Sequence, residues 1–160
     1  RRILKYNPKS VAGRIGLAAS HLKKGQLPQA IAEYKQLSHL PQIRLLLVRL
    51  LLVQNMQLPE IARDWREIQI LLDQAKEAGD RPTEVVLLQA ETLALQGQID
   101  DARHVIEHAR TSQTDRLEFL IALANLAEKS GEQSQAALWM GQALAAVGND
   151  QDAEIGRAHV

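Results

Sequence analysis

Apolar side chains recur along the chain every three or four residues, not at every second residue. Runs such as AIAEYKQL (30–37) and ARHVIEHA (102–109) place their apolar residues on one face of a helix. Sustained alternation is missing, and so are the Asn-Gly and Asp-Gly pairs that close tight β-hairpins. The pattern therefore predicts an all-α protein.

Glycine and proline lie between these apolar runs and mark where the helices begin and end. The positions concerned are Pro8, Gly25, Pro28, Pro41, Pro59, Gly79, Pro82, Gly97, Gly131 and Gly148. They divide the chain into about eight helices of roughly ten to twenty residues each. Because the connections are short, consecutive helices are expected to form antiparallel hairpins.

One ten-residue stretch has echoes along the chain. The four copies are GQLPQAIAEY (25–34), MQLPEIARDW (56–65), GQIDDARHVI (97–106) and GEQSQAALWM (131–140). Their starts are separated by 31, 41 and 34 residues, and a period near 34 is typical of one helix-turn-helix unit in a repeat protein. The extra seven residues of the long spacing equal about two helical turns. They predict an extended helix from about 59 to 77.

The period, the turn glycines and a set of alanines together resemble the tetratricopeptide repeat (TPR) family over about residues 8–150. The small residue that opens the second helix of each repeat is matched by Ala30, Ile61, Ala102 and Ala136. The large core residue four positions later is matched by Tyr34, Trp65, Ile106 and Met140. The small residue of the first helix is matched by Ala18, Ala90 and Ala124, with Arg49 in the second repeat.

This resemblance implies a right-handed superhelical solenoid of antiparallel helix hairpins, TPR-like, with related helical-hairpin arrays as the alternative. The expected repeats are 11–41, 42–82 with an extended second helix, 83–116 and 117–150. Residues 1–10 are interpreted as the tail of a preceding repeat and 151–160 as the start of a further helix. Since a solenoid normally has polar capping elements and none is visible, the chain is expected to be a piece of a longer array.

Composition excludes several classes of function. With 19 basic and 19 acidic residues and 3% aromatic residues, the chain has neither the positive charge nor the stacking surface that nucleic acid requires. The absence of cysteine excludes disulfides and thiolate metal sites but leaves the cellular compartment open. The stretch IRLLLVRLLLV (43–53) is about half as long as a membrane span and contains two arginines, so it predicts a buried helix.

The residues from His104 to His108 match the H-x-x-E-H pattern of inverted zinc peptidases. Such a site needs a third protein ligand and a cleft, whereas here Ile106 and Ala109 are the expected inward residues and both histidines lie on the outer flank. A metallohydrolase is therefore the weakest hypothesis. No catalytic residue, no metal site and no cofactor is predicted, and Trp65 and Trp139 are interpreted as packing residues.

The candidate site is the concave groove that stacked hairpins form, lined by the first helix of each repeat. In the TPR family this groove binds extended or helical peptides. Helical spacing assigns to it Ile15, Ala19, Leu22, Lys23, Leu46, Leu50, Gln54, Leu87, Glu91, Ile121, Asn125 and Glu128.

The expected ligand is an apolar or amphipathic segment of a partner protein, because Leu46, Leu50, Leu87 and Ile121 form an apolar floor. Glutamates 84, 91, 118 and 128 add a mildly acidic wall, which favours basic residues beside the apolar anchors. Two alternatives stay open. In the first, superhelical packing or a neighbouring helix covers the apolar floor, so that no partner binds there. In the second, the chain is a structural spacer or a self-assembly domain that forms homo-oligomers through its terminal repeats.

Overall fold

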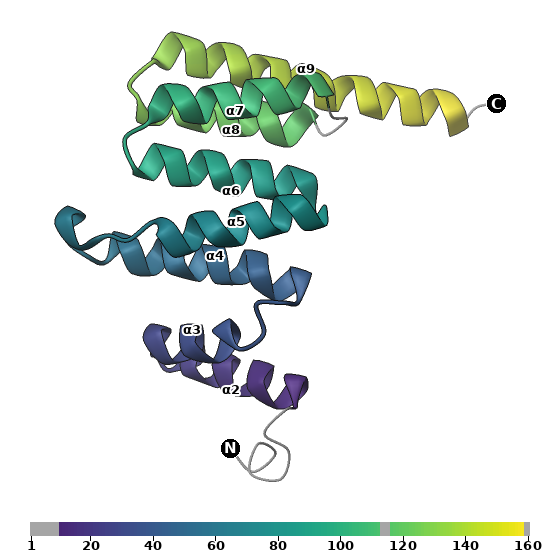
Figure 1. The fold of residues 1–160 in the computed structure, drawn as a ribbon. Helices are drawn as coiled ribbons and strands as arrows, with labels where there is room; N and C mark the ends of the chain where they lie inside the picture. Colours follow the sequence, from purple (N-terminus) through teal and green to yellow (C-terminus); the bar gives the residue numbers. More distant parts are fainter. Residues whose placement is uncertain (1–9, 113–115, 159–160) are drawn as a thin grey trace. The chain divides into compact units, whose positions relative to one another are not determined.

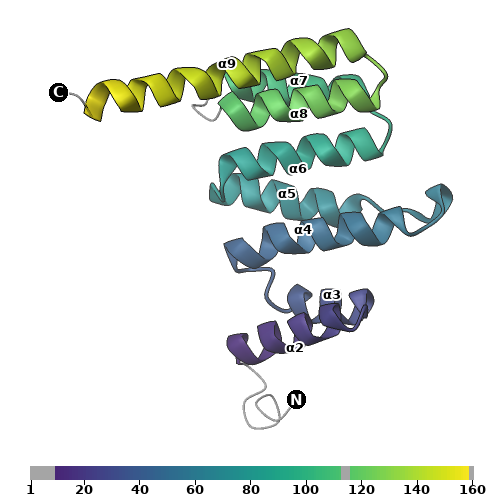
Figure 2. The same cartoon turned by 180° about the vertical axis from the view of Figure 1, so that it is seen from behind.

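The computed structural model describes residues 10–112 and 116–158, and every regular element in these ranges is a helix (Figures 1 and 2). The elements are α2 (Val11–Lys23), α3 (Leu27–Lys35), α4 (Pro41–Met56), the 3-10 turn η1 (Glu60–Ala62), α5 (Arg66–Ala78), α6 (Pro82–Leu95), α7 (Ile99–Ser112), α8 (Arg116–Lys129) and α9 (Gln133–Ala158). The all-α fold class and the expected eight helices are thereby confirmed for these residues.

The chain divides into two compact units, unit 1 (residues 1–85) and unit 2 (residues 86–160). In unit 1, α2 packs against α3 and α4 packs against α5. In unit 2, α8 packs against both α7 and α9. The expected tail of a preceding repeat at residues 1–10 lies, apart from Ser10, outside the described residues.

The starts of the helices in unit 1 follow from local sequence. The Ser10 hydroxyl accepts a hydrogen bond from the Gly13 amide at 3.0 Å, which satisfies one of the free donors at the start of α2. Pro28 and Pro41 lie in the first turns of α3 and α4, where the missing amide proton has no intrahelical partner to lose.

The hairpin of α2 and α3 buries a small residue of each helix. Ala18 and Ala30 are fully buried, as the repeat pattern predicts, and Tyr34 is buried beside them. Burial raises the pKa of the Tyr34 hydroxyl because the charged phenolate loses its hydration.

Helix α4 contains the strongly apolar stretch, and it is buried on more than one side. Leu45, Leu47, Val48 and Leu51 are all buried, which confirms the prediction of a buried helix. Within the described residues, none of the helices combines the length and apolar character needed to cross a membrane.

A buried ion pair connects α4 to the end of α5. The Arg44 guanidinium donates to the Asp80 carboxylate, and both residues are buried. Arg44 also donates to the main-chain carbonyls of Ser38 at 3.2 Å, Gln74 at 3.3 Å and His39 at 3.4 Å. The guanidinium is therefore surrounded by acceptors, as a buried charge requires.

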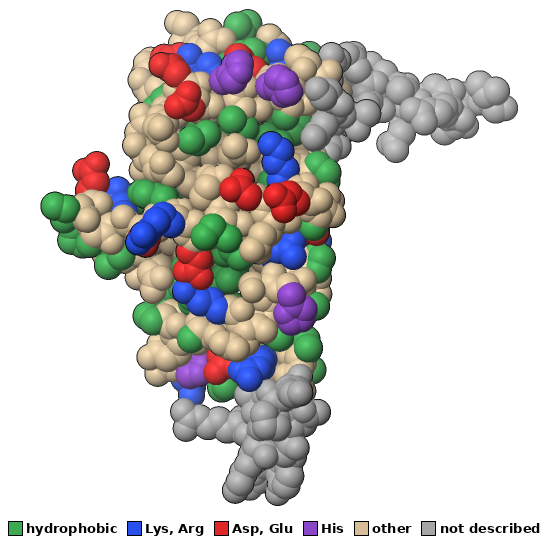
Figure 3. Space-filling view, in the orientation of Figure 1, with side chains coloured by type: hydrophobic (Ala, Val, Ile, Leu, Met, Phe, Trp, Pro, Cys, Tyr) green, Lys and Arg blue, Asp and Glu red, His purple; other side chains and the backbone are tan. Residues whose placement is uncertain are grey.

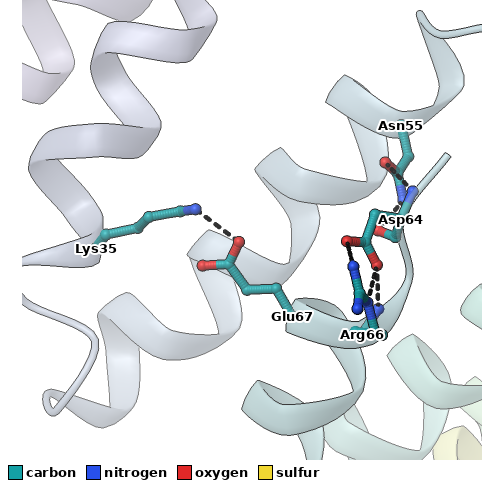
Figure 4. A network of polar contacts seen from close by, with 5 residues as sticks. All are labelled: Lys35, Asn55, Asp64, Arg66 and Glu67. Carbon is teal, nitrogen blue, oxygen red and sulfur yellow. Dashed lines mark hydrogen bonds and ion pairs between the residues drawn. The ribbon is translucent and has the colours of Figure 1, made fainter. Parts of the chain in front are cut away.

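The prediction of one extended helix from about 59 to 77 is wrong. Helix α4 ends at Met56, η1 follows, and α5 begins only at Arg66. Asp64 sets this start, since its carboxylate accepts from the Arg66 amide at 3.0 Å and from the Arg66 guanidinium at 3.1 and 2.8 Å (Figure 4). The Arg66 hydrogen bonds lower the pKa of the Asp64 carboxyl to about 2.

Ile61 therefore does not occupy the predicted packing position at the start of the second helix of its repeat. Its side chain is 99% exposed in η1. Trp65 precedes α5 and is half-buried, while Ile68, Leu72 and Ala75 form the buried stripe of that helix. The Lys35 ammonium donates to the Glu67 carboxylate at 2.6 Å, and this ion pair links α3 to the first turn of α5 (Figure 4).

The core of unit 2 contains most of the small residues that the repeat pattern assigned. Ala90, Ala102 and Ala124 are buried in one cluster with Ile106, and Phe119 is fully buried among them. This arrangement confirms the predicted packing positions on α6, α7 and α8.

Helix α9 corrects two predictions. Met140 was expected in the core but is 42% exposed, whereas Trp139 is 9% exposed and lies below the Arg110 guanidinium, 5.3 Å from the ring centre. The inward stripe of α9 runs through Trp139 and Ala143, one residue out of phase with the pattern. In addition, α9 is continuous to Ala158, so Gly148 does not end it and residues 151–158 do not start a new helix.

Candidate functional site: an apolar cavity in unit 2

A cavity of about 450 Å³ lies among α6, α7 and α8 of unit 2. Most of its lining residues come from α6 and α8, and α7 contributes Ile99 and the buried Ile106. Most of the lining side chains are apolar, and the complete lining is Leu87, Ala90, Glu91, Ala94, Leu95, Ile99, Ile106, Ala122, Asn125, Leu126 and Lys129.

The turn between α6 and α7 positions the two helices around the cavity. Gly97 has φ 81°, a left-handed conformation that side chains with a Cβ rarely adopt. Its amide donates to the Ala94 carbonyl at 3.0 Å, and the Gln98 amide donates to the Leu93 carbonyl at 2.9 Å. These bonds end α6 one turn after Glu91 and direct α7 back along it.

The lining residues of α6 and α8 follow helical spacing. On α6, Leu87, Glu91 and Ala94 are separated by four and three residues, and on α8 the same holds for Ala122, Asn125 and Lys129 in the order three and four. Side chains at these spacings share one helix face. Small side chains such as Ala94 and Ala122 leave the space that larger residues would fill.

Three polar side chains, Glu91, Asn125 and Lys129, are exposed and surround the apolar interior. The acidic wall expected from the sequence is therefore changed in two ways. Lys129 adds a positive charge beside Glu91, and Glu84 is already paired with Arg49 and Arg81 at 2.9 Å each. The cavity presents one charge of each sign to a ligand.

The structure brings together three of the predicted groove residues, Leu87, Glu91 and Asn125, as parts of this cavity lining. Ile121 and Glu128 lie on the same helix as Asn125 and are exposed, but they do not line the cavity. The face of α8 that lines the cavity is rotated by one residue from the predicted one.

The remaining predicted residues belong to unit 1. They lie on α2 and α4, where Lys23 is exposed and the others are half-buried: Ile15, Ala19, Leu22, Leu46, Leu50 and Gln54. Their partial exposure leaves apolar surface on both helices.

Sequence reasoning missed Lys129, Ala122 and Leu126 as lining residues. The available signal was the spacing from Asn125, because Ala122 precedes it by three residues and Lys129 follows it by four. Assigning the buried positions Phe119 and Leu123 to the core first would have set the correct face of α8.

The histidines of the H-x-x-E-H pattern lie on α7. His104 and His108 are exposed, while Ile106 and Ala109 are buried, as expected from the helical phase. Figure 3 shows two histidine side chains next to each other over this part of the surface. Among the residues that the structure describes, no group of three histidine, aspartate or glutamate side chains could hold a metal ion.

The helix pairs and the buried alanines define a helical repeat protein. Comparison with solved structures finds a thermophilic TPR protein of Thermus thermophilus, with a TM-score of 0.60 and 25% sequence identity over 99% of this chain and 84% of that chain. The resemblance to the TPR family is thus confirmed for the fold. No known family matches the chain by sequence, and no curated protein does.

Proposed function

We propose that the chain is a non-catalytic protein-interaction module and that the unit 2 cavity binds an apolar or amphipathic segment of a partner protein. The observation that carries the proposal is an apolar cavity of about 450 Å³ bordered by exposed Glu91, Asn125 and Lys129. Binding pockets in proteins are typically apolar, with a few polar groups that fix orientation, and have volumes of roughly 300–1,000 Å³.

The ligand chemistry follows from the lining. Leu87, Leu95 and Ile99 offer contacts to an aliphatic or aromatic anchor, and full burial of such a side chain contributes roughly 1.5–3 kcal/mol. The Asn125 amide can donate to and accept from a peptide backbone. Glu91 and Lys129 favour a segment with a basic residue on one side of its anchor and an acidic residue on the other.

The half-buried side chains of α2 and α4 form a second and separate candidate contact surface within unit 1. Leu46 and Leu50 are separated by one helical turn on α4, and Ile15 and Ala19 are separated by one turn on α2. The two surfaces are tested separately, because Leu50 belongs to unit 1 and Leu87 to unit 2.

The experiment is a peptide-display screen at physiological salt on the parent chain and on the variants Leu87→Glu and Leu50→Glu. Ile70→Glu is the matched control, since Ile70 is 55% exposed on α5 and lines no predicted groove. Circular dichroism confirms that each variant stays helical. Peptides with spaced apolar anchors should enrich on the parent and on Ile70→Glu and be lost on Leu87→Glu. Equal enrichment on Leu87→Glu would refute the cavity as the site.

A second candidate function, a spacer or self-assembly domain, is favoured by the outer face of α9. Residues 133–147 contain no charged side chain, and Met140, Leu144 and Val147, which share one helix face by their spacing, are exposed, with Leu144 at 68%. An uncharged apolar helix face of this kind is typical of an association surface. The variant Leu144→Glu should lower the average mass in sedimentation equilibrium if α9 mediates assembly, and an unchanged mass would contradict it.

A further inference from the structure

Residues 57–65, named here the α4–α5 loop, expose apolar side chains. Ile61 is 99% exposed, Leu58 is exposed beside it, and Val53 and Met56 are exposed on the last turns of α4. Figure 1 shows the loop projecting from the ends of α4 and α5, and Figure 3 shows hydrophobic side chains gathered on this projection. The loop takes up the extra residues of the 41-residue spacing between repeats.

The loop is held in one conformation by hydrogen bonds at its base. The buried Asn55 amide donates to the Asp64 carbonyl at 2.7 Å and accepts from the Asp64 amide at 3.3 Å (Figure 4). Inside the loop, the Arg63 guanidinium donates to the Leu58 carbonyl at 3.3 Å, and the Ala62 amide donates to the Pro59 carbonyl at 2.9 Å. Ile61 is therefore presented by an ordered turn, which reduces the entropy lost on binding.

The same chain carries a surface with the complementary chemistry. The unit 2 cavity is apolar inside and has Lys129 and Glu91 at its border. Ile61 is preceded by the exposed Glu60 and followed, two positions on, by Arg63. An apolar anchor between an acidic and a basic residue thus matches an apolar cavity between a basic and an acidic residue.

We propose that Ile61 of one copy docks into the unit 2 cavity of a second copy, with Glu60 facing Lys129 and Arg63 facing Glu91. The proposal rests on the proposed function, because it names a ligand for the same cavity. The loop and the cavity are different surfaces, so the contact is heterologous and each pair of copies keeps one free loop and one free cavity. Since the contact is small, association is weak and appears at high protein concentration.

The test uses two variants that remove one surface each. Ile61→Asp removes the anchor at a fully exposed position, and Asn125→Trp blocks the cavity from an exposed position on α8. Ile70→Asp is the matched control, because it places the same charge at another exposed isoleucine. All chains also carry Leu144→Glu, so that association through α9 cannot contribute. Sedimentation velocity from micromolar to millimolar protein gives the average mass.

The chain with Leu144→Glu alone and its Ile70→Asp derivative should form larger species with rising concentration. Ile61→Asp and Asn125→Trp should each remain monomeric, with association weakened by at least about tenfold. An equimolar mixture of the two should form a dimer and nothing larger, since only one intact loop and one intact cavity can pair. Concentration-independent monomers throughout, or a mixture that stays monomeric, would overturn the proposal.

The outcome for this proposal is separable from the outcome for the proposed function. Ile61→Asp should still enrich peptides with spaced apolar anchors, because its own cavity is intact, whereas Asn125→Trp should not. Peptide binding without self-association would refute the docking of Ile61 and retain the binding site. Self-association that Asn125→Trp does not weaken would show that Ile61 contacts another surface, which also refutes the proposal.

Discussion

Replacing Arg44 by methionine should destabilise unit 1 more than any surface substitution. The change removes a guanidinium that pairs with the buried Asp80 carboxylate and donates to three main-chain carbonyls. Methionine replaces most of the hydrocarbon part of the arginine side chain but has no guanidinium group. What remains is a buried carboxylate without its cation.

The expected decrease in the free energy of unfolding follows from the environment of Arg44 and of Asp80. Breaking a buried ion pair from one side typically costs about 3–5 kcal/mol, and Arg44→Met should lie in this range. Asp80→Asn should cost less, about 1–3 kcal/mol, because the guanidinium keeps its carbonyl acceptors and the amide oxygen of asparagine. The double variant should be less destabilised than the sum of the two changes by about 0.5–3 kcal/mol.

The assay is urea unfolding at neutral pH followed by far-ultraviolet circular dichroism, with the free energy of unfolding taken from each transition. Arg81→Met serves as the control, since its pairing with Glu84 is at the surface and should contribute at most about 1 kcal/mol. The reasoning is refuted if the two buried changes add without coupling, or if Arg44→Met is no more harmful than Arg81→Met.

Three further predictions concern the turn, the core and an ion pair. Gly97→Ala should destabilise the chain by about 1–2 kcal/mol in urea unfolding because of its positive φ, whereas Gly141→Ala, in open space on α9, should be neutral or stabilising. Phe119→Ala should cost about 3–5 kcal/mol in the same assay, since the ring is fully buried. In an NMR pH titration the Asp64 carboxyl should have a pKa of about 2, below its ordinary 3.8. Because this pKa is lowered in the folded state, the pair of Asp64 and Arg66 stabilises the fold above pH 3.8. This contribution is lost as the pH falls through 2. Arg66→Gln should return this pKa towards its ordinary value, and an unchanged pKa would contradict the assigned cause.

Much of the fold follows from features that are local in the sequence. The alanines at positions 18, 30, 90, 102 and 124 are buried where the repeat pattern places them, because close helix approach depends on a small side chain at a fixed helical phase. The α6 part of the cavity lining also follows from local spacing, because Leu87 and Glu91 are four residues apart and share one helix face.

The conformation of the α4–α5 connection could not be predicted from the similarity between residues 25–34 and 56–65. The dipeptide Leu-Pro occurs in both copies, and Pro28 lies inside the first turn of α3, whereas Pro59 precedes only η1. The difference arises from the Asn55 side chain, which forms hydrogen bonds with the main chain of Asp64 nine residues away, and from the Asp64 carboxylate, which accepts from Arg66. Pairing of Arg44 with Asp80 spans an even longer separation, so that periodicity carries no signal for it.

The hydrogen bonds between Asn55 and Asp64 join the two ends of the α4–α5 loop. Because the ends of the loop are fastened to each other, a change in the length of the segment between them need not be transmitted to the packing of α4 against α5. The loop is thus a natural place for grafting. A foreign epitope or a metal-binding peptide inserted between Glu60 and Ala62 would be displayed on a rigid base, in the position that the chain already gives to Ile61.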